Sequence, residues 1–460
     1  MKKVFWKSDW FTALIVSLIF LFAASSEFMQ TLERKAYDLG VRASHRAPGD
    51  KIAVIAIDDQ SIANLGRLPW SREVHAKMID ILANAKAKVI ADTVFFIEPQ
   101  IDAGLVYIKK IDTFVSSSTI PTVSPEASAL NSMIKQAEAE LDYDGKLSDS
   151  IQAANNVVLA MPFTIGEPLG NPDKPLPDYV SRNALTRVID RIGAENMGLL
   201  PIPTSSAFSP IPEVGEVSSA IGHLNVIQDA DGVIRVEPLV LSYYNHFYPS
   251  LSLQIATKYL NLKPQDIEVR LGEGIKIGKL NIATDSALEM NTFFYGKQSG
   301  NPAFAIDSFF DVLSGKIPAE KYQNKIVLIG MGATGDGGDA QATPISSNMK
   351  PIETLAHSVA SILNEDFFVS PSWSIWAERG VWLFVALYLI VLFPRLKAGT
   401  AVMVTVIMLT ALIAAYFILM TQRATWLQLM MPATLLLVGH ALLTTKRYLM
   451  TEQGKAKSEA

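Results

Sequence analysis

Residues 51–96 read KIAVIAIDDQSIANLGRLPWSREVHAKMIDILANAKAKVIADTVFF, and this stretch decides the fold. It opens with KIAVIAID (51–58), a nearly continuous run of β-branched and small apolar residues that is typical of a strand buried on both faces. Ser71 then caps a helix with one apolar face, and KVIADTVFF (88–96) repeats the buried-strand pattern. A strand, a helix and a strand within about 45 residues predict a right-handed parallel crossover unit.

The same strand pattern returns downstream, in NVVLAMPF (156–163) and KIVLIG (325–330), and the second of these precedes a helix expected at 352–363. Between the second and third strands, residues 101–146 turn polar and small, which indicates an insertion with one helix near 126–141. The turn residues DADG (229–232), with β-rich runs on both sides, favour a β-hairpin. Together these patterns predict one domain with a mixed α/β sheet.

Apolar residues are concentrated outside this domain. The chain has 460 residues, of which 49% are hydrophobic and 18% charged, and long uncharged runs lie near both ends. A helix of about 18 residues covers roughly 27 Å, close to the hydrocarbon thickness of a bilayer. We therefore expect a bundle of transmembrane α-helices, one N-terminal and three C-terminal. The expected spans are residues 10–28, 373–393, 398–420 and 424–444.

Basic residues at the ends of the spans indicate their orientation. Those expected in the cytoplasm are Lys2, Lys3, Lys7, Arg395, Lys397, Lys446 and Arg447. Residues 1–9 and the linker 445–460 are then cytoplasmic, and residues 29–372 form a periplasmic domain of a multi-pass protein in a bacterial inner membrane. An alternative for the first run is a signal peptide cleaved near Ser25, and it also exports the domain.

Several classes of function are disfavoured. The chain has no cysteine and a net charge of −5 without a basic stripe, so neither a thiolate metal site nor a nucleic-acid partner is expected. The six histidines form no HExxH pair, and neither a nucleophile elbow nor a phosphate-binding P-loop is present. We expect no catalytic residue, no metal site and no cofactor, and hence no enzyme activity in this chain.

Acidic residues follow the expected strands. Asp58 and Asp59 end the first strand, Asp92 lies in the second with Glu98 after it, and Asp339 follows KIVLIG. Because ligands of open α/β sheets bind at the carboxyl ends of strands, these acids form a candidate ligand-binding cleft. Its expected companions are Arg67 and Trp70, on the loop beside Asp58. The alternative is that these aspartates cap helices and turns.

Residues 330–335 (GMGATG) match the glycine fingerprint of dinucleotide-binding folds after a buried strand. That fold needs a helix directly after the glycines, whereas residues 336–344 continue as loop. A glycine-rich turn is therefore the favoured interpretation.

Three stretches resemble the CHASE domain of type two, an extracytoplasmic sensory domain attached to bacterial cyclases, histidine kinases and serine/threonine kinases. They are residues 51–99, 220–240 and 325–363, and the resemblance spans roughly residues 32–365. It implies a sensor followed by three membrane helices and a cytoplasmic effector. Residues 101–146 are longer than is usual in that family.

These observations predict the sensory and membrane-anchoring part of a bacterial transmembrane receptor, which relays a periplasmic signal to a kinase or cyclase outside this chain. The expected partners are an unknown periplasmic small molecule or protein, a cytoplasmic effector domain or subunit, membrane lipid and further copies in a homo-oligomer. Either the chain continues as a longer receptor or it works with a separate subunit. The alternative function is a non-enzymatic membrane scaffold that assembles through its periplasmic domain.

Overall fold

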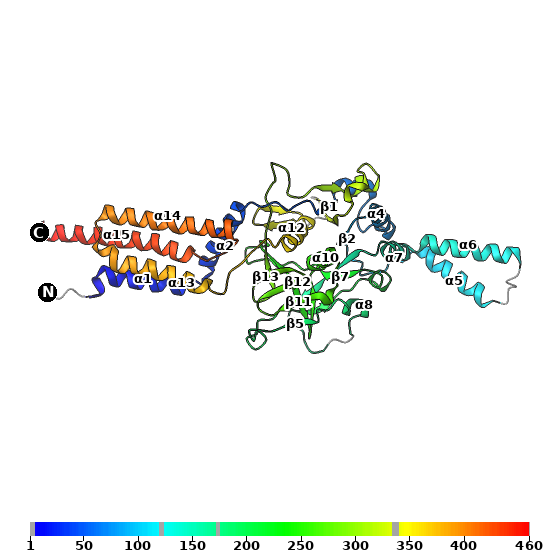
Figure 1. The fold of residues 1–460 in the computed structure, drawn as a ribbon, viewed down its shortest axis with the longest axis horizontal. Helices are drawn as coiled ribbons and strands as arrows, with labels where there is room; N and C mark the ends of the chain where they lie inside the picture. The colour runs from blue at the N-terminus through cyan, green and yellow to red at the C-terminus, as the bar shows by residue number, and fades with distance from the viewer. Residues whose placement is uncertain (1–4, 119–123, 172–174, 334–339, 460) are drawn as a thin grey trace. The chain divides into compact units, whose positions relative to one another are not determined.

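The computed structural model describes residues 5–118, 124–171, 175–333 and 340–459 (Figure 1). The chain forms two compact units. Residues 47–367 form an α/β unit, and residues 1–46 together with 368–460 form a helical unit.

A six-stranded parallel sheet is the centre of the α/β unit. Its strand order is β15-β1-β16-β2-β3-β7. The strands are β1 (Ile52–Ile57), β2 (Val89–Asp92), β3 (Val157–Met161), β7 (Ala220–His223), β15 (Ile306–Ser308) and β16 (Ile326–Met331). The predicted crossover from β1 to β2 is present, but β16 lies between these strands and pairs with both, Ile329 lying opposite Ile55 and Asp92.

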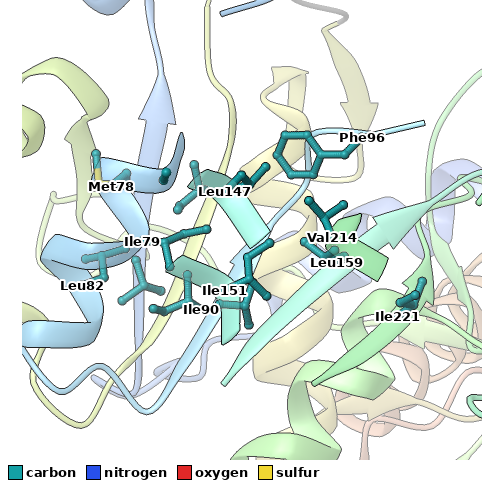
Figure 2. Close-up of a cluster of buried hydrophobic side chains, with 14 of the residues drawn as sticks. Met78, Ile79, Leu82, Ile90, Phe96, Leu147, Ile151, Leu159, Val214 and Ile221 are labelled. Carbon is teal, nitrogen blue, oxygen red and sulfur yellow. The ribbon is translucent and has the colours of Figure 1, made fainter. Parts of the chain in front are cut away.

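Helices cover both faces of this sheet, which gives three layers. Helices α4 (Arg72–Asn84) and α7 (Tyr143–Ala154) pack on one face through Ile79, Leu82, Leu147 and Ile151, as Figure 2 shows. Helices α10 (Leu251–Tyr259) and α12 (Pro351–Asn364) contact the other face. Burial on both faces explains why β1, β3 and β16 are apolar at every position.

Smaller sheets surround the central one. Two four-stranded sheets have the orders β10-β9-β6-β4 and β13-β12-β11-β5, each mixing parallel and antiparallel pairs, and β8 pairs antiparallel with β14. The strands are β4 (Phe163–Ile165), β5 (Arg187–Ile189), β6 (Ile202–Ala207), β8 (Val236–Pro238), β9 (Val240–Tyr243), β10 (His246–Pro249), β11 (Ile267–Arg270), β12 (Gly274–Ile277), β13 (Leu280–Ala283) and β14 (Glu289–Thr292). The mixed α/β sheet expected from the sequence is present.

The predicted hairpin around Asp229 to Gly232 is wrong. These residues do form a turn, in which the Gly232 N–H donates to the Asp229 carbonyl at 2.8 Å. The chain before the turn is not a strand, and the local hairpin is instead formed by β9 and β10. The side chain of Arg235 stabilises the turn by binding both Asp229 and Asp231.

The insertion at 101–146 contains two long helices, α5 (Ala103–Ser117) and α6 (Pro125–Leu141), where one was predicted. They pack against each other as a hairpin next to α7 (Figure 1). Asp102 caps α5 by accepting from the N–H groups of Gly104 and Leu105. The other short elements of this unit are α3 (Asp59–Leu65), α8 (Asp178–Ser181), α9 (Pro212–Gly215), α11 (Phe309–Leu313), β17 (Gln341–Thr343) and β18 (Ser346–Met349).

The chain enters and leaves the α/β unit at neighbouring points. Near the exit, the side-chain amide of Asn364, the last residue of α12, donates to the carbonyl of Pro48 at 3.0 Å. Pro48 follows the entry point at Ala47. The boundary of the unit then falls within β19 (Phe367–Phe368).

The helical unit consists of α1 (Asp9–Ala23), α2 (Glu27–Ala43), α13 (Ser374–Leu387), α14 (Ala398–Arg423) and α15 (Met430–Glu459). A π-helical turn and a 3-10 turn extend α13 to Arg395. By length and composition, two of the described helices could cross a membrane, Ser374–Arg395 and Ala398–Arg423. A third is added if α1 and α2, which meet at 75°, count as one broken span.

Helix boundaries in this unit differ from the expected spans for local reasons. The run expected at 10–28 ends at Ala23, because Ser26 starts a new helix by accepting from the Met29 N–H. Helix α15 begins at Met430 rather than at residue 424. The N–H of Met430 donates to the carboxylate of Glu33 at 2.8 Å. Helix α2, expected in the exported domain, belongs to the helical unit.

Hydrogen bonds between polar side chains connect the three C-terminal helical segments. The Tyr388 hydroxyl lies 2.8 Å from the Thr405 hydroxyl, which in turn lies 2.8 Å from Nδ1 of His440. At the end of the bundle, Arg447 binds the carboxylate of Asp9 at 3.1 Å and so connects α15 to the first helix. These contacts fix the helices against one another where the surrounding side chains are apolar.

Candidate ligand-binding site

Asp58, directly after β1, accepts hydrogen bonds from two other elements of the fold. Its Oδ1 accepts from the Ser61 N–H at 2.8 Å, which caps α3, and from the Ser61 hydroxyl at 2.5 Å. The Ser308 hydroxyl at the end of β15 donates to the same oxygen at 2.9 Å. The carboxylate therefore joins two strands and a helix, as the capping alternative predicts.

Asp92 is fully buried at the end of β2 and faces a histidine. Its Oδ2 lies 2.8 Å from Nδ1 of His75 on α4, and its Oδ1 accepts from the Val94 N–H at 3.0 Å. Both side chains are enclosed, with exposed fractions of 0% for Asp92 and 1% for His75. A paired carboxylate at this depth connects a strand to its covering helix and is closed to a ligand.

The other predicted residues that the structure describes lie in different surroundings. Trp70 is buried, packs against Phe309 with ring centroids 5.0 Å apart and donates from Nε1 to the Gly66 carbonyl. Three of the predicted residues are exposed, namely Asp59, Arg67 and Glu98. Asp339 lies outside the described residues. None of the six described residues lines the cavity found at this edge of the sheet.

That cavity has a volume of about 310 Å³ and lies at the carboxyl ends of β2, β7 and β16. It is near the lower end of the range for small-molecule pockets. Its lining residues are Thr93, Phe95, Leu224, Asn225, Val226, Glu237, Met331, Gln341, Pro351, Ile352, Thr354 and Leu355. The edge of the sheet is the one at which a ligand site was predicted, but different residues form the cavity.

Glu237 on β8 is the acidic group of the cavity. Its Oε1 accepts from the Ser252 hydroxyl at 2.5 Å and its Oε2 from the Ser358 hydroxyl at 3.2 Å. Burial raises the pKa of this carboxyl to about 7, although the two hydroxyl donors act in the opposite direction. The group can therefore offer a ligand either a proton or a charge near neutral pH.

Two further polar groups border the cavity. The side-chain Oε1 of Gln341 is buried and accepts no hydrogen bond from the described part of the chain. The Thr93 hydroxyl donates to the Ile329 carbonyl at 3.0 Å, so its proton is already used in a hydrogen bond to β16. A ligand that donates a hydrogen bond would satisfy Gln341, and an apolar surface would contact Phe95, Met331 and Leu355.

The glycines after β16 allow a close approach of chain segments. A Cβ at Gly330 would overlap the Thr93 hydroxyl and lie 2.8 Å from Cδ1 of Ile352, and a Cβ at Gly332 would lie 2.6 Å from Cβ of Ala56. The next helix of the described chain, α12, begins only at Pro351, after the β17–β18 hairpin. Glycine at 330 is required for packing between β16 and α12, and among the described residues no helix directly follows the glycines.

The sequence model of the CHASE2 domain matches residues 12–393, which include the whole α/β unit and its flanking apolar helices. The chain belongs to the CHASE2 family. CHASE2 domains are extracellular sensory domains of signalling receptors, so this chain contains a sensory domain. Comparisons with curated proteins and with solved structures give no match.

In this CHASE2 chain, sequence patterns did not point to Glu237, Gln341 or Thr354. They belong to β8, β17 and α12, and they meet only because the fold brings these elements to the same edge of the sheet. One usable signal was present: Glu237 is an acid within VEPLV, an otherwise apolar strand-like run.

Proposed function

We propose that this CHASE2 chain is the sensory and membrane-anchoring part of a bacterial transmembrane receptor. Its α/β unit faces the periplasm and binds a small molecule in the cavity beside Glu237. The helices hold the protein in the inner membrane as a multi-pass protein, in contact with lipid. The output is a cytoplasmic kinase or cyclase, on a continuation of the chain or on a separate subunit.

One observation supports this proposal: α12 forms a wall of the cavity and precedes, by a short segment of chain, the apolar helix α13. Pro351, Ile352, Thr354 and Leu355 in its first turns line the cavity. Helix α12 ends at Asn364, and the apolar helix α13 begins at Ser374. A ligand that binds one position of α12 better than another therefore shifts the segment that precedes a candidate span.

Binding can be tested without knowing the ligand, through the unfolding midpoint of the full chain in detergent. The probe is the dialysable fraction of a periplasmic extract, since a ligand that binds only the folded state raises the midpoint. Val226→Trp fills the rim of the cavity, and Val188→Trp on β5 is its control, because these valines are similarly exposed, at 41% and 39%. The extract should stabilise wild type and Val188→Trp but not Val226→Trp. Equal stabilisation of all three would refute this cavity as the site.

The periplasmic location has its own test. Alkaline phosphatase fused after Leu260, within the α/β unit, should be active in intact cells, because the enzyme works only outside the cytoplasm. Fusion after Thr445 should be inactive. An inactive fusion at Leu260 would reverse the proposed orientation.

A specific surface favours the second candidate, a membrane scaffold that assembles through its α/β unit. On α5, Tyr107, Ile111 and Phe114 lie on one face at helical spacing and are 66%, 45% and 69% exposed. Such a stripe on a projecting hairpin is typical of an association surface. Replacing all three by serine should lower the mass measured by light scattering in detergent if copies assemble here, and an unchanged mass would remove this candidate.

A further inference from the structure

A second cavity lies in the α/β unit, with a volume of about 270 Å³. The loop after β14, the loop before β15, β18 and α12 surround it. Six of its lining residues define its chemistry: Tyr295, Lys297, Phe304, Ser346, Glu353 and His357.

One of the lining residues is a histidine with an available donor. His357 is only 3% exposed, and its Nδ1 accepts from the Tyr295 N–H at 3.1 Å. Burial lowers the pKa of His357 to about 3, so the ring is neutral and its proton is on Nε2. No described residue accepts from this Nε2, which leaves an N–H donor for a molecule in the cavity.

Aromatic rings hold that donor in place and supply apolar walls. The ring of His357 stacks on Tyr295 with centroids 5.9 Å apart, and Phe304 meets it edge-on at 5.0 Å. Tyr295 is itself anchored, because its hydroxyl donates to Asp366 at 2.8 Å. The site is therefore preorganised rather than formed by loose side chains.

Groups of opposite charge complete the cavity. Glu353 precedes His357 by four residues on α12, so the two side chains lie on the same face about one turn apart. Glu353 is half-buried, and this burial raises the pKa of its carboxyl. Lys297 is exposed at the rim. The cavity thus offers a carboxyl, an ammonium and an imidazole N–H around an aromatic wall.

We propose that this cavity binds a free α-amino acid. The ligand carboxylate lies toward Lys297 and Nε2 of His357, its ammonium toward Glu353, and its side chain against Phe304 and Tyr295. Each charged group of the ligand then meets a complementary group of the protein. The inference concerns a second site and does not require that the cavity beside Glu237 bind anything.

The two cavities share α12 as a common wall. At about 100° per residue, Ile352 and Leu355 point to one side of the helix and Glu353 and His357 to the opposite side. A ligand at either cavity therefore contacts the same helix.

Isothermal titration of the full chain in nanodiscs tests the proposal, with each of the common amino acids as probe. At least one should bind. Its N-acetyl derivative lacks the ammonium, and its amide lacks the carboxylate. Each derivative should bind at least about tenfold more weakly than the amino acid, which is a loss of about 1.4 kcal/mol in binding free energy. These ligand changes leave the protein intact, so the result does not depend on folding of a variant.

Protein variants then locate the site. Glu353→Gln should weaken binding about tenfold, while Glu320→Gln, at an exposed glutamate elsewhere in the unit, should not. Val226→Trp, which fills the other cavity, should leave amino-acid binding unchanged and so separates this inference from the proposed function. The proposal is wrong if no amino acid binds at millimolar concentration. It is also wrong if the Glu353→Gln protein binds the amino acid as tightly as wild type does and both derivatives bind as tightly as the parent amino acid.

Discussion

The hydroxyl of Ser358 donates a hydrogen bond to Oε2 of Glu237 across 3.2 Å, and this contact ties α12 to β8 beside the first cavity. Ser358 lies one turn beyond the residues of α12 that line the cavity. The protonation of the Glu237 carboxyl therefore affects a hydrogen bond to α12, the helix that precedes α13 in the chain.

The first prediction concerns pH. The folded-state pKa of Glu237 is raised to about 7, so the folded protein holds this proton more firmly than the unfolded chain, whose pKa is near its ordinary value of 4.5. Its contribution to stability is fully present below about pH 4.5 and is lost as pH rises toward about 7. Glu237→Gln should remove this loss, on the order of 2 kcal/mol. Urea unfolding of wild type and variant at about pH 5 and pH 8 measures it, with Glu320→Gln as control. A difference between the two proteins that does not change with pH would contradict the prediction.

The second prediction separates structural from ligand-binding carboxylates. Asp92→Ala leaves His75 buried without its partner and should lower the free energy of unfolding by about 3 to 5 kcal/mol. Glu98→Ala, at an exposed position after the same strand, should change it by less than about 0.5 kcal/mol. Chemical unfolding of the full chain in detergent provides both values. Equal stability of the two variants would show that the buried pair contributes nothing.

The third prediction tests the role assigned to the glycine after β16. Gly330→Ala places a methyl group against the Thr93 hydroxyl and Ile352, and overpacking of this kind costs about 1 to 3 kcal/mol. Gly296→Ala is the control, because a Cβ there has no neighbour within 4 Å. Thermal unfolding should show a lower midpoint for Gly330→Ala alone. A stable Gly330→Ala protein would mean that α12 can move away from the sheet without cost.

The fourth prediction concerns the helical unit. Thr405→Val removes the hydroxyl between Tyr388 and His440 and should destabilise the bundle by about 1 kcal/mol. Thr410→Val, on an exposed face of α14, is a matched change outside this chain of hydrogen bonds. Unfolding in mixed detergent micelles compares them. A larger effect at Thr410 would contradict the arrangement of α13, α14 and α15.

The central sheet could be predicted from sequence because its strands are buried on both faces. The runs 52–57, 89–92 and 326–331 are apolar at nearly every position, and this pattern is local. Their neighbours in the sheet are not a local property. Nothing in residues 51–96 indicates that β16, more than 200 residues later, lies between β1 and β2.

The site was less predictable because its chemistry depends on partners distant in sequence. Asp92 was assigned to a ligand cleft, since a single sequence does not show that His75 lies 2.8 Å from it. Asp58 carries a visible capping signal in Ser61, three residues later, but its contact with Ser308 is set by the fold. The helix missed at 103–117 had local signals, with Asp102 as its cap and Leu105 and Ile108 on one side.

The α/β unit is joined to the rest of the polypeptide by two covalent crossings, at 46–47 and 367–368, and the Asn364–Pro48 hydrogen bond holds these crossings next to each other. Because Asn364 and Pro48 are bonded to each other, a displacement of the end of α12 is expected to displace the start of the α/β unit as well, so the two segments that continue into α13 and α2 begin from a linked pair of residues.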